Sequence, residues 1–586
     1  MNWIMNVRRL NGLREMPIAC KQAPTQDTAV ASFPDPNTPT DDPYAERPSF
    51  RRRYAAWFWS AGVFIATVVL TVLSFPPYPT PEFAYAFAAP AIFWAYLKPS
   101  FRRYALTLFA AQAVAWIILL GWLHHVTWAG LLLLGPLVGA WVGVWYLAVW
   151  WTMPRLPAHA PLTRVAAIAG LAALWVVIEW SRTWLLGGFS WLPLAASQWQ
   201  RNINLQVAAY TGAYGVSFIL IAFNLGITAY CHRLLKEKQL GLRKRSPEFM
   251  LALLVLIFPS FILLTEVYNQ QRRELGRFSL VQPYVPQTLK WDATEGPGIV
   301  KSLEELTLNA ALDRPDVILW PEAVTPWAVR GEATMRSFVE SLSARANVPM
   351  LLGSIAVESA GAVDETWYNG VFLVTSREGL QPDYYAKRKL VPFGEFVPLR
   401  PVLGWLEKFV EVGGDFESGE DSHPLLVPLR RGLTVVGPLI CFEDIFPQLA
   451  RASVLAGAEV LTVHTNNGWF GEGGAAYQHA AHSALRAVET RRPVVRVGNG
   501  GWSGWFDEYG NVRGAMTDAE GSIYFRGATM MTVTRDERWA GRESVYVRYG
   551  DWFVLACLGL ASLGFFLVRR DPPPPVVEKP ESPAAV

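Results

Sequence analysis

Apolar runs of membrane-spanning length dominate the first half of this chain of 586 residues. A transmembrane helix needs about 20 consecutive, mainly apolar residues. Runs of this kind predict seven helices before residue 270 and one near the C-terminus, at about 55–74, 81–97, 104–125, 128–151, 163–186, 212–231, 249–267 and 551–568. A single run could be a core helix of a large soluble protein, but seven in close succession indicate a polytopic membrane domain.

The composition supports a membrane protein that also has a soluble part. Hydrophobic residues make up 52% of the chain and charged residues only 17%, and 26 tryptophans suit anchoring at membrane interfaces. The net charge of +3 and the lack of a basic cluster interleaved with aromatic residues argue against a nucleic-acid partner. The four cysteines, at positions 20, 231, 441 and 557, lack the spacing of zinc ligands or of a disulfide framework. We expect no metal and no other cofactor.

Basic residues fall in alternate loops between the predicted helices. Arg51–Arg53 precede the first helix, and further Lys and Arg residues follow the second, fourth and sixth. The positive-inside rule then places the N-terminus and these loops in the cytoplasm. Seven crossings leave residues 270–548 outside the cytoplasm, and an eighth helix within 549–570 returns the chain to it.

The two ends of the chain have the composition of disordered tails. Residues 1–54 are polar and rich in Pro, Asp and Thr, and they lack the apolar core of a signal peptide. Residues 571–586 contain a run of prolines. We therefore expect two cytoplasmic tails around a membrane domain at 55–269, an extracytoplasmic domain at 270–548 and a last helix at 549–570.

The segment 270–548 alternates β-rich runs with helical stretches. Strand-like runs include Val317–Leu319, Leu433–Ile440 and Val460–Thr465, and helix-like stretches lie at about 299–312, 332–346, 447–456 and 476–490. This alternation predicts a layered α/β domain with a central sheet.

Three strand ends in this segment each carry an unusual polar residue, namely Glu322, Lys387 and Cys441. Each alone could be structural: a turn cap, a solvated base or a buried thiol. Together they supply a carboxylate that can take a proton, a cation that can hold an oxyanion, and a nucleophile. Cys441 is also the only cysteine in the segment that we expect outside the cytoplasm, so it has no disulfide partner there.

The residues around this trio resemble a known signature. Trp320-Pro321-Glu322, Lys387 followed by Leu390-Val391-Pro392-Phe393-Gly394-Glu395, and Cys441-Phe442-Glu443 resemble the Glu–Lys–Cys motifs of the nitrilase superfamily. With apolar helices on both sides, the chain resembles the apolipoprotein N-acyltransferase family over about residues 55–570. Further matching motifs are Glu179-Trp180-Ser181-Arg182, Gly188-Phe189-Ser190-Trp191, Gly212-Ala213-Tyr214-Gly215, Val281-Gln282-Pro283, Lys290-Trp291 and Asn466-Asn467-Gly468-Trp469-Phe470-Gly471.

The resemblance implies an αββα sandwich, which we expect on the periplasmic side of a bacterial inner membrane. We expect the protein to be a monomer, although the sequence does not give the oligomeric state. An acyl chain from a phospholipid would pass to the thiol of Cys441 as a thioester. It would then pass to the N-terminal amine of the S-diacylglyceryl cysteine of an apolipoprotein. Glu322 would act as the general base, and Lys387 would bind the oxyanion together with the backbone N–H of Phe442. Glu395 and Glu443 would hold Lys387 in place.

The chain departs from the family pattern at a few positions. Phe442 stands where Tyr is usual, Asn467-Gly468 where Asp-Ala is common, and Pro283 where Gly is usual. None of these positions belongs to the Glu322, Lys387 and Cys441 trio.

An apolar stretch after Glu395 bears on access of lipid to the site. Apolar residues recur at helical spacing there, at Leu399, Leu403, Leu406 and Val410. The stretch, with Trp405, is either an ordinary core helix or a lid at the membrane interface that hinges at Gly413-Gly414. We count Trp291, Trp405, Trp469 and Phe470 as candidate lipid-binding residues.

Other functions remain possible from the sequence. His479 and His482 lie three apart on a predicted helix, but no cysteine or carboxylate nearby in the sequence completes a metal site. A membrane-anchored amidase or nitrilase could use the same trio, although one anchor would suffice for it. A transporter or binding scaffold fits less well, because the membrane helices carry few ionisable residues besides Glu179 and Arg182.

Overall fold

The computed structural model describes residues 50–236, 246–267, 269–287, 289–290, 292, 294–397, 400 and 415–570. By its contacts the chain divides into two units, Met1–Ala55 and Ala56–Val586. The second unit contains both the apolar helices, apart from the first residues of α1, and the β-sheets, so contacts between helices and sheets lie within one unit.

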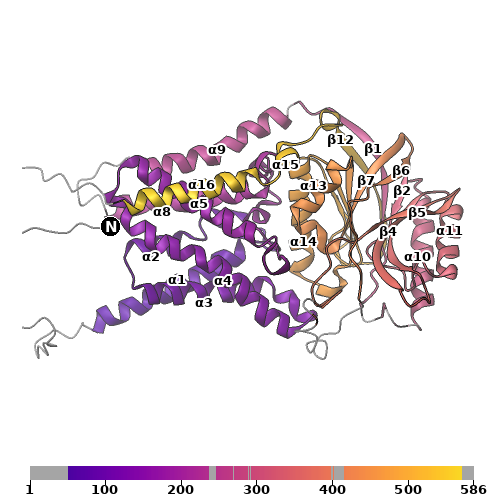
Figure 1. Ribbon diagram of the computed structural model, residues 1–586, viewed down its shortest axis with the longest axis horizontal. Coiled ribbons are helices and arrows are strands. Elements are labelled where there is room, and N and C mark those ends of the chain that lie inside the picture. The colour runs from indigo at the N-terminus through magenta and orange to yellow at the C-terminus, as the bar shows by residue number, and fades with distance from the viewer. Residues whose placement is uncertain are drawn as a thin grey trace, which may run out of the picture. The chain divides into compact units, whose positions relative to one another are not determined.

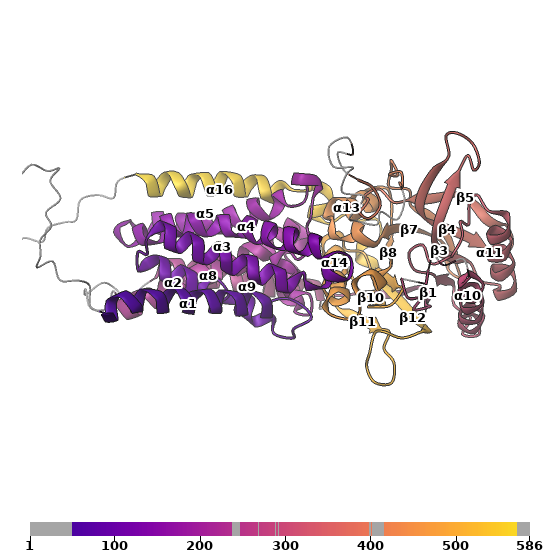
Figure 2. The ribbon, with the colours of Figure 1, turned by 90° about the horizontal axis from the view of Figure 1, so that it is seen from below.

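Long apolar helices run alongside one another in the first part of the chain and at its end (Figure 2). Within the described ranges, five helices are long and apolar enough to cross a membrane. These five are α4 (Trp128–Thr152, continued by a 3-10 turn to Ala158), α5 (Pro161–Ser181), α8 (Ala213–Lys236), α9 (Pro247–Val267) and α16 (Trp552–Arg569). The apolar part of α1 (Phe50–Leu73) is shorter, and α3 (Phe101–Leu119) carries two arginines in its first turn.

The prediction of a spanning helix at 81–97 is wrong. The chain forms a 3-10 turn at Pro81–Tyr85 and then the short helix α2 (Ala89–Tyr96). Pro81 and Pro90 each occupy the first turn of a helix, where a missing N–H is tolerated, and neither could sit inside a longer one without loss of a hydrogen bond. Asn224 of α8 bridges the break, since its amide donates to the carbonyl of Ala84 and accepts from the N–H of Ala88 (2.8 and 3.0 Å).

Two six-stranded sheets form the second part of the molecule (Figure 1). The first has the order β12-β1-β2-β3-β4-β5 and the second β11-β10-β9-β8-β7-β6. The strands of the first sheet are β1 (Arg272–Gln282), β2 (Val317–Leu319), β3 (Met350–Glu358), β4 (Thr366–Thr375), β5 (Gly379–Ala386) and β12 (Gly527–Asp536). Those of the second are β6 (Leu425–Leu429), β7 (Gly432–Ile440), β8 (Val460–Thr465), β9 (Val494–Gly498), β10 (Gly504–Phe506) and β11 (Val512–Ala515).

Helices cover the outer faces of both sheets. Helices α10 (Gly296–Ala311) and α11 (Ala333–Ala346) pack on the first sheet, and α13 (Pro447–Leu455) and α14 (Gly474–Thr490) pack on the second (Figure 1). Between the sheets, apolar side chains from both inner faces form one core, with Phe278, Leu280, Leu319, Val371, Val436, Ile440 and Val495 among its members. The predicted αββα sandwich is confirmed.

The directions of the strands place the polar residues that follow them at the same edge of each sheet. Strands β1, β2 and β3 are parallel, as are β7, β8 and β9. Strand β5 runs antiparallel to β4 and therefore in the direction of β3. The carboxyl ends of β2 and β5 consequently lie at one edge of the first sheet, and those of β7 and β8 lie at one edge of the second.

One buried side chain of helix α14, Gln478, contacts the ends of several apolar helices. The Gln478 amide donates to the carbonyl oxygens of Pro76 and Leu119 (3.2 and 3.0 Å). Its oxygen accepts from the indole N–H groups of Trp122 and Trp191 (3.1 and 2.9 Å). One side chain thus joins the sandwich to three separate connections of the helical part.

We predict that Gln478→Ala lowers the thermal stability of the detergent-solubilised protein. The substitution leaves two carbonyls, the buried indole N–H of Trp191 and the partly buried indole N–H of Trp122 unpaired, and each buried unpaired group costs about 1–3 kcal/mol. Gln381→Ala is the matched control, because partly exposed Gln381 donates only to the nearby carbonyl of Gly379 (3.2 Å). Equal melting temperatures for the two variants would contradict the proposed contribution of Gln478.

Candidate active site

Three strand ends bring Glu322, Lys387 and Cys441 together, as the sequence predicts. The Lys387 ammonium lies 3.0 Å from the Glu322 carboxylate, and the Cys441 thiol is close enough to the same carboxylate for its negative charge to raise the pKa of the thiol. All three residues are buried, with 1–7% of their surface exposed. The trio is therefore a single contact group shielded from bulk water.

The backbone turns sharply at Cys441. Its φ of +51° lies in the left-handed region, at the junction of β7 and a 3-10 helix, Cys441–Ile445. Non-glycine residues adopt this conformation at some cost in energy, and such strain concentrates at functional sites. The turn places the thiol just before the first amide groups of a helix, which have no acceptor within the helix.

Lys387 carries a positive charge despite its burial. Burial alone would lower the pKa of the ammonium, but the carboxylates of Glu322 and Glu395 outweigh this effect and raise it above its usual value. The Glu395 contact is the shorter of the two, at 2.7 Å against 3.0 Å. The predicted contact between Glu395 and Lys387 is present.

Glu322 is an ionised carboxylate with several donors. Besides Lys387, it accepts from the side-chain amide of Asn369 (2.9 Å) and the backbone N–H of Asn466 (3.0 Å). Burial raises the pKa of Glu322, but the charges of Lys387 and Lys290 outweigh it and hold the pKa below the ordinary value. Glu322 can therefore accept a proton at neutral pH.

Cys441 is a neutral thiol in this environment. Burial, followed by the negative charge of Glu322, raises its pKa to about 12, although Lys387 acts in the opposite direction. A thiol of this kind needs a base to become a nucleophile. The neighbouring carboxylate of Glu322 is placed to act as that base.

Glu443 does not contact the ammonium of Lys387, contrary to the prediction. One carboxylate oxygen accepts from the backbone N–H groups of Arg388 and Lys389 (2.6 and 3.1 Å). The other accepts from the N–H of Ile440 and the hydroxyl of Tyr385 (both 2.7 Å). The turn after Cys441 points this carboxylate toward backbone N–H groups. Glu443 therefore holds the residues before and after Lys387 against the turn at Cys441.

Lys290, Asn369 and Asn466 were not singled out as site residues from the sequence. Lys290 is buried, and its ammonium lies 3.5 Å from the carbonyl oxygen of Glu322. Burial lowers the pKa of Lys290 to about 8. The one sequence signal for Asn369 is an amide at the start of an otherwise apolar strand-like run, Asn369–Thr375.

A second buried group of charges lies directly behind Cys441. The Asp444 carboxylate contacts the His479 ring (2.9 Å) and the guanidinium of Arg496 (2.6 Å). The same His479 nitrogen lies 3.0 Å from the carbonyl oxygen of Cys441. The Nε2 atom of His482 accepts a hydrogen bond from the backbone N–H of Leu192 (3.3 Å). Both histidines are therefore structural partners, and among the described residues no group of three or more His, Cys, Asp or Glu could hold a metal ion.

Aromatic residues connect the trio with the apolar helices. The Phe442 ring packs against Phe446 and Phe189 (centroids 5.1 and 6.4 Å apart). Phe470 packs against Trp122 and Trp191 (4.3 and 6.1 Å).

The other candidate lipid-binding residues are only partly described. Trp469 is 40% exposed. Trp291, Trp405, Gly413-Gly414 and all of the proposed lid helix except Arg400 lie outside the described residues.

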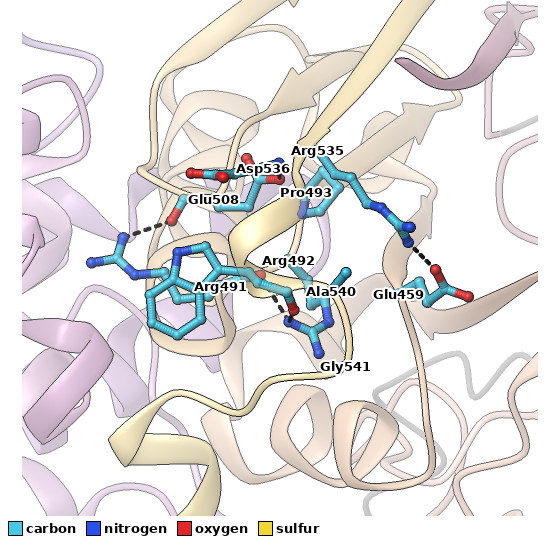
Figure 3. Close-up of a pocket in the computed structure, with 10 residues that line it drawn as sticks. Glu459, Arg491, Arg492, Pro493, Glu508, Arg535, Asp536, Ala540 and Gly541 are labelled. Atoms are coloured by element: carbon cyan, nitrogen blue, oxygen red, sulfur yellow. Dashed lines mark hydrogen bonds and ion pairs between the residues drawn. The ribbon is translucent and has the colours of Figure 1, made fainter. Parts of the chain in front are cut away.

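A small pocket at the end of β12 is a separate feature (Figure 3). Arg491 donates to the carbonyl oxygen of Glu508 (2.8 Å), Arg492 donates to that of Trp539 (3.1 Å), and Arg535 pairs with Glu459. These contacts tie the residues before β9 to the segments after β10 and β12, and they tie β12 to the residue before β8. The pocket contains no nucleophile and shares no residue with the trio.

We predict that Glu443→Gln destabilises the protein more than Tyr385→Phe does. A glutamine oxygen can accept on one side only, so its NH₂ group would face two donors, and a buried donor without an acceptor costs about 1–3 kcal/mol. Tyr385→Phe removes one donor and leaves the other three bonds to Glu443. Thermal unfolding of the two variants tests this difference, and a smaller effect of Glu443→Gln would refute the assigned role.

Comparison with known proteins agrees with this arrangement. Residues 67–226 match the family model "Apolipoprotein N-acyltransferase N-terminal domain", and residues 280–535 match "Carbon-nitrogen hydrolase". An apolipoprotein N-acyltransferase from Geobacter metallireducens is 32% identical over 69% of this chain and 75% of its own length. The Methylococcus capsulatus enzyme of the same name is 31% identical over 68% and 74%.

A solved amidase of the nitrilase superfamily from Nesterenkonia covers 49% of this chain and 98% of its own, at 15% identity and a TM-score of 0.35. The family is established by the sequence relatives, of which this chain covers about three quarters. The chain belongs to the apolipoprotein N-acyltransferase family.

Proposed function

We propose that this protein is an apolipoprotein N-acyltransferase that moves an acyl chain through a thioester on Cys441. The donor is a phospholipid, and the acceptor is the N-terminal amine of the S-diacylglyceryl cysteine of an apolipoprotein. The observation that supports this most is the buried contact group of Glu322, Lys387 and Cys441, in a chain of this family that also has apolar helices.

In the first step, Glu322 takes the proton of the Cys441 thiol as the sulfur attacks the ester carbonyl of the phospholipid. Lys387 and the backbone N–H of Phe442 stabilise the oxyanion that forms. Collapse of this intermediate breaks the bond between the carbonyl carbon and the glycerol oxygen. Glu322 returns its proton to that oxygen, so a lysophospholipid leaves and the acyl chain stays on the sulfur.

In the second step, the amine of the acceptor attacks the thioester carbonyl. Glu322 takes a proton from the amine, and the same donors stabilise the second oxyanion. Collapse breaks the carbon–sulfur bond, and the proton passes from Glu322 to the sulfur. The thioester keeps the acyl group reactive between two bulky lipids, which therefore need not be bound together. These steps require no cofactor.

Lys387 acts as a fixed cation and not as a proton donor. Its raised pKa keeps it charged through both steps. A charge held in place before the reaction stabilises the oxyanion without a cost of reorganisation. Glu395 and Asn369 hold the Lys387–Glu322 pair, and Glu443 positions the backbone.

The proposed location is a bacterial inner membrane, with residues 270–548 in the periplasm and both tails in the cytoplasm. The alternation of basic loops supports this orientation. We assign 55–269 and 549–570 to the membrane and treat the enzyme as a monomer. Phe470 and Trp469 are proposed to line the lipid path, with Trp291 and Trp405 as further candidates.

Contacts between sandwich and helices favour this function over that of a soluble-substrate amidase. Phe442 follows the nucleophile directly, and its ring packs on Phe189 in the connection after α5. A hydrolase for soluble amides has no need of this continuity between nucleophile and apolar helices.

We predict that wild-type protein incubated with an acyl-labelled phospholipid gains one acyl chain in its intact mass. The adduct should be labile to hydroxylamine and absent from Cys441→Ala. Glu322→Gln should form it roughly 100-fold more slowly or worse, as loss of a general base implies. Cys441→Ser is a conservative control for the nucleophile, and an unmodified wild-type thiol with every phospholipid would refute the acyltransferase proposal.

A further inference from the structure

Lys389 is a half-buried cation near the active site that has no carboxylate partner among the described residues. Its ammonium lies over the Phe446 ring, 5.2 Å from the ring centroid. Burial lowers the pKa of this group, and no ion pair opposes the shift. A ring attracts a cation without neutralising it, so the position favours a bound anion.

Charged groups around Lys389 are already engaged with other partners. Glu443 accepts four hydrogen bonds, one of them from the Lys389 backbone N–H. Arg388 donates to the Tyr385 hydroxyl (3.0 Å) and to the carbonyl of Leu449 (3.2 Å). The Glu443 carboxylate is therefore not available to the Lys389 side chain.

The ring beneath Lys389 belongs to the aromatic contact that leads from Cys441 to the apolar helices. Phe446 packs edge-to-face on Phe442, and Phe442 packs on Phe189. Gly188 lies so close to Phe446 that a Cβ there would be 3.0 Å from the ring. Lys389 thus lies where the nucleophile, the aromatic rings and the connection after α5 meet.

That connection presents apolar side chains outward. Trp184, Leu185 and Leu186 are 50%, 43% and 75% exposed at the end of the apolar helix α5. Exposed Trp and Leu at the end of a spanning helix are typical of contact with the lipid interface. Acyl chains that enter beside these residues would pass Phe189 and Phe442 on the way to Cys441.

We propose that Lys389 binds the phosphate of the donor phospholipid and so positions its ester for Cys441. This inference rests on the proposed function. The short glycerol backbone joins the phosphate to the ester, so a phosphate on Lys389 places the ester carbonyl beside Phe442 and the thiol. Lys389 is then a substrate-binding residue that acts on donor recognition and not on the chemical steps.

The test compares two acyl donors on three variants. Phosphatidylglycerol in detergent micelles carries the phosphate, and the p-nitrophenyl ester of the same fatty acid lacks it. Lys389→Ala should slow acylation of Cys441 by phosphatidylglycerol about tenfold at low donor concentration, as loss of a charged hydrogen bond implies. The change should lie in KM and leave kcat near the wild-type value, and acylation by the p-nitrophenyl ester should be unchanged.

Lys389→Arg should retain most of the activity with phosphatidylglycerol, because it keeps the charge. Lys301→Ala is the matched control, since Lys301 is an exposed lysine of α10, on the outer face of the first sheet. Inorganic phosphate should not inhibit the wild type, because the headgroup reaches Lys389 together with its acyl chains.

Three results would overturn the inference. If Lys389→Ala slowed acylation by both donors equally, Lys389 would have a structural role. If Lys389→Ala did not slow acylation by phosphatidylglycerol, Lys389 would have no role in donor binding. Inhibition of the wild type but not of Lys389→Ala by inorganic phosphate would indicate a site for the free anion. If wild-type protein is acylated by the p-nitrophenyl ester but by no phospholipid, the proposed function itself fails, whatever Lys389 does.

Discussion

The ion cluster of Lys387, Glu322 and Glu395 is the interaction on which the site depends. Buried charges are costly unless they are paired and hydrogen-bonded. Here one ammonium faces two carboxylates, and Asn369 with the N–H of Asn466 satisfies the remaining lone pairs of Glu322. The cluster keeps Glu322 ionised and Lys387 charged, and the negative charge of Glu322 helps to keep the thiol protonated. The proposed base, the cation and the proposed nucleophile are therefore all set by one arrangement.

The same site is continuous with the apolar helices. Helix α14 supplies His479 to the Cys441 carbonyl and, one residue earlier, Gln478 to three connections of the helical part. Phe442 and Phe446 extend the contact to Phe189 and Lys389. An enzyme that takes acyl chains from a bilayer needs this continuity, because the ester must reach the thiol without leaving an apolar environment.

Residue type at strand ends made much of the site predictable. Glu322 and Cys441 follow apolar strands, Lys387 directly follows β5, and strands that run in the same direction bring such ends together. The role of Glu443 was not predictable, because spacing in the chain does not show where the turn after Cys441 aims a carboxylate. The prediction of one helix at 81–97 was wrong because a hydropathy pattern does not show that Pro81 and Pro90 lie in the first turns of two separate helices. The Gln478 contacts could not be predicted either, since their partners lie more than 280 residues away in sequence.

The central claim is that Glu322 acts as a base on a neutral thiol, and the protonation state of Cys441 tests it most directly. The ultraviolet absorbance of the thiolate can be followed against pH as the difference between wild type and Cys441→Ala. We predict no thiolate signal at neutral pH and a rise only in strongly alkaline solution, because burial and Glu322 raise the pKa of Cys441 to about 12. A full thiolate signal at neutral pH would contradict the account, since the nucleophile would then be ionised before any base acts.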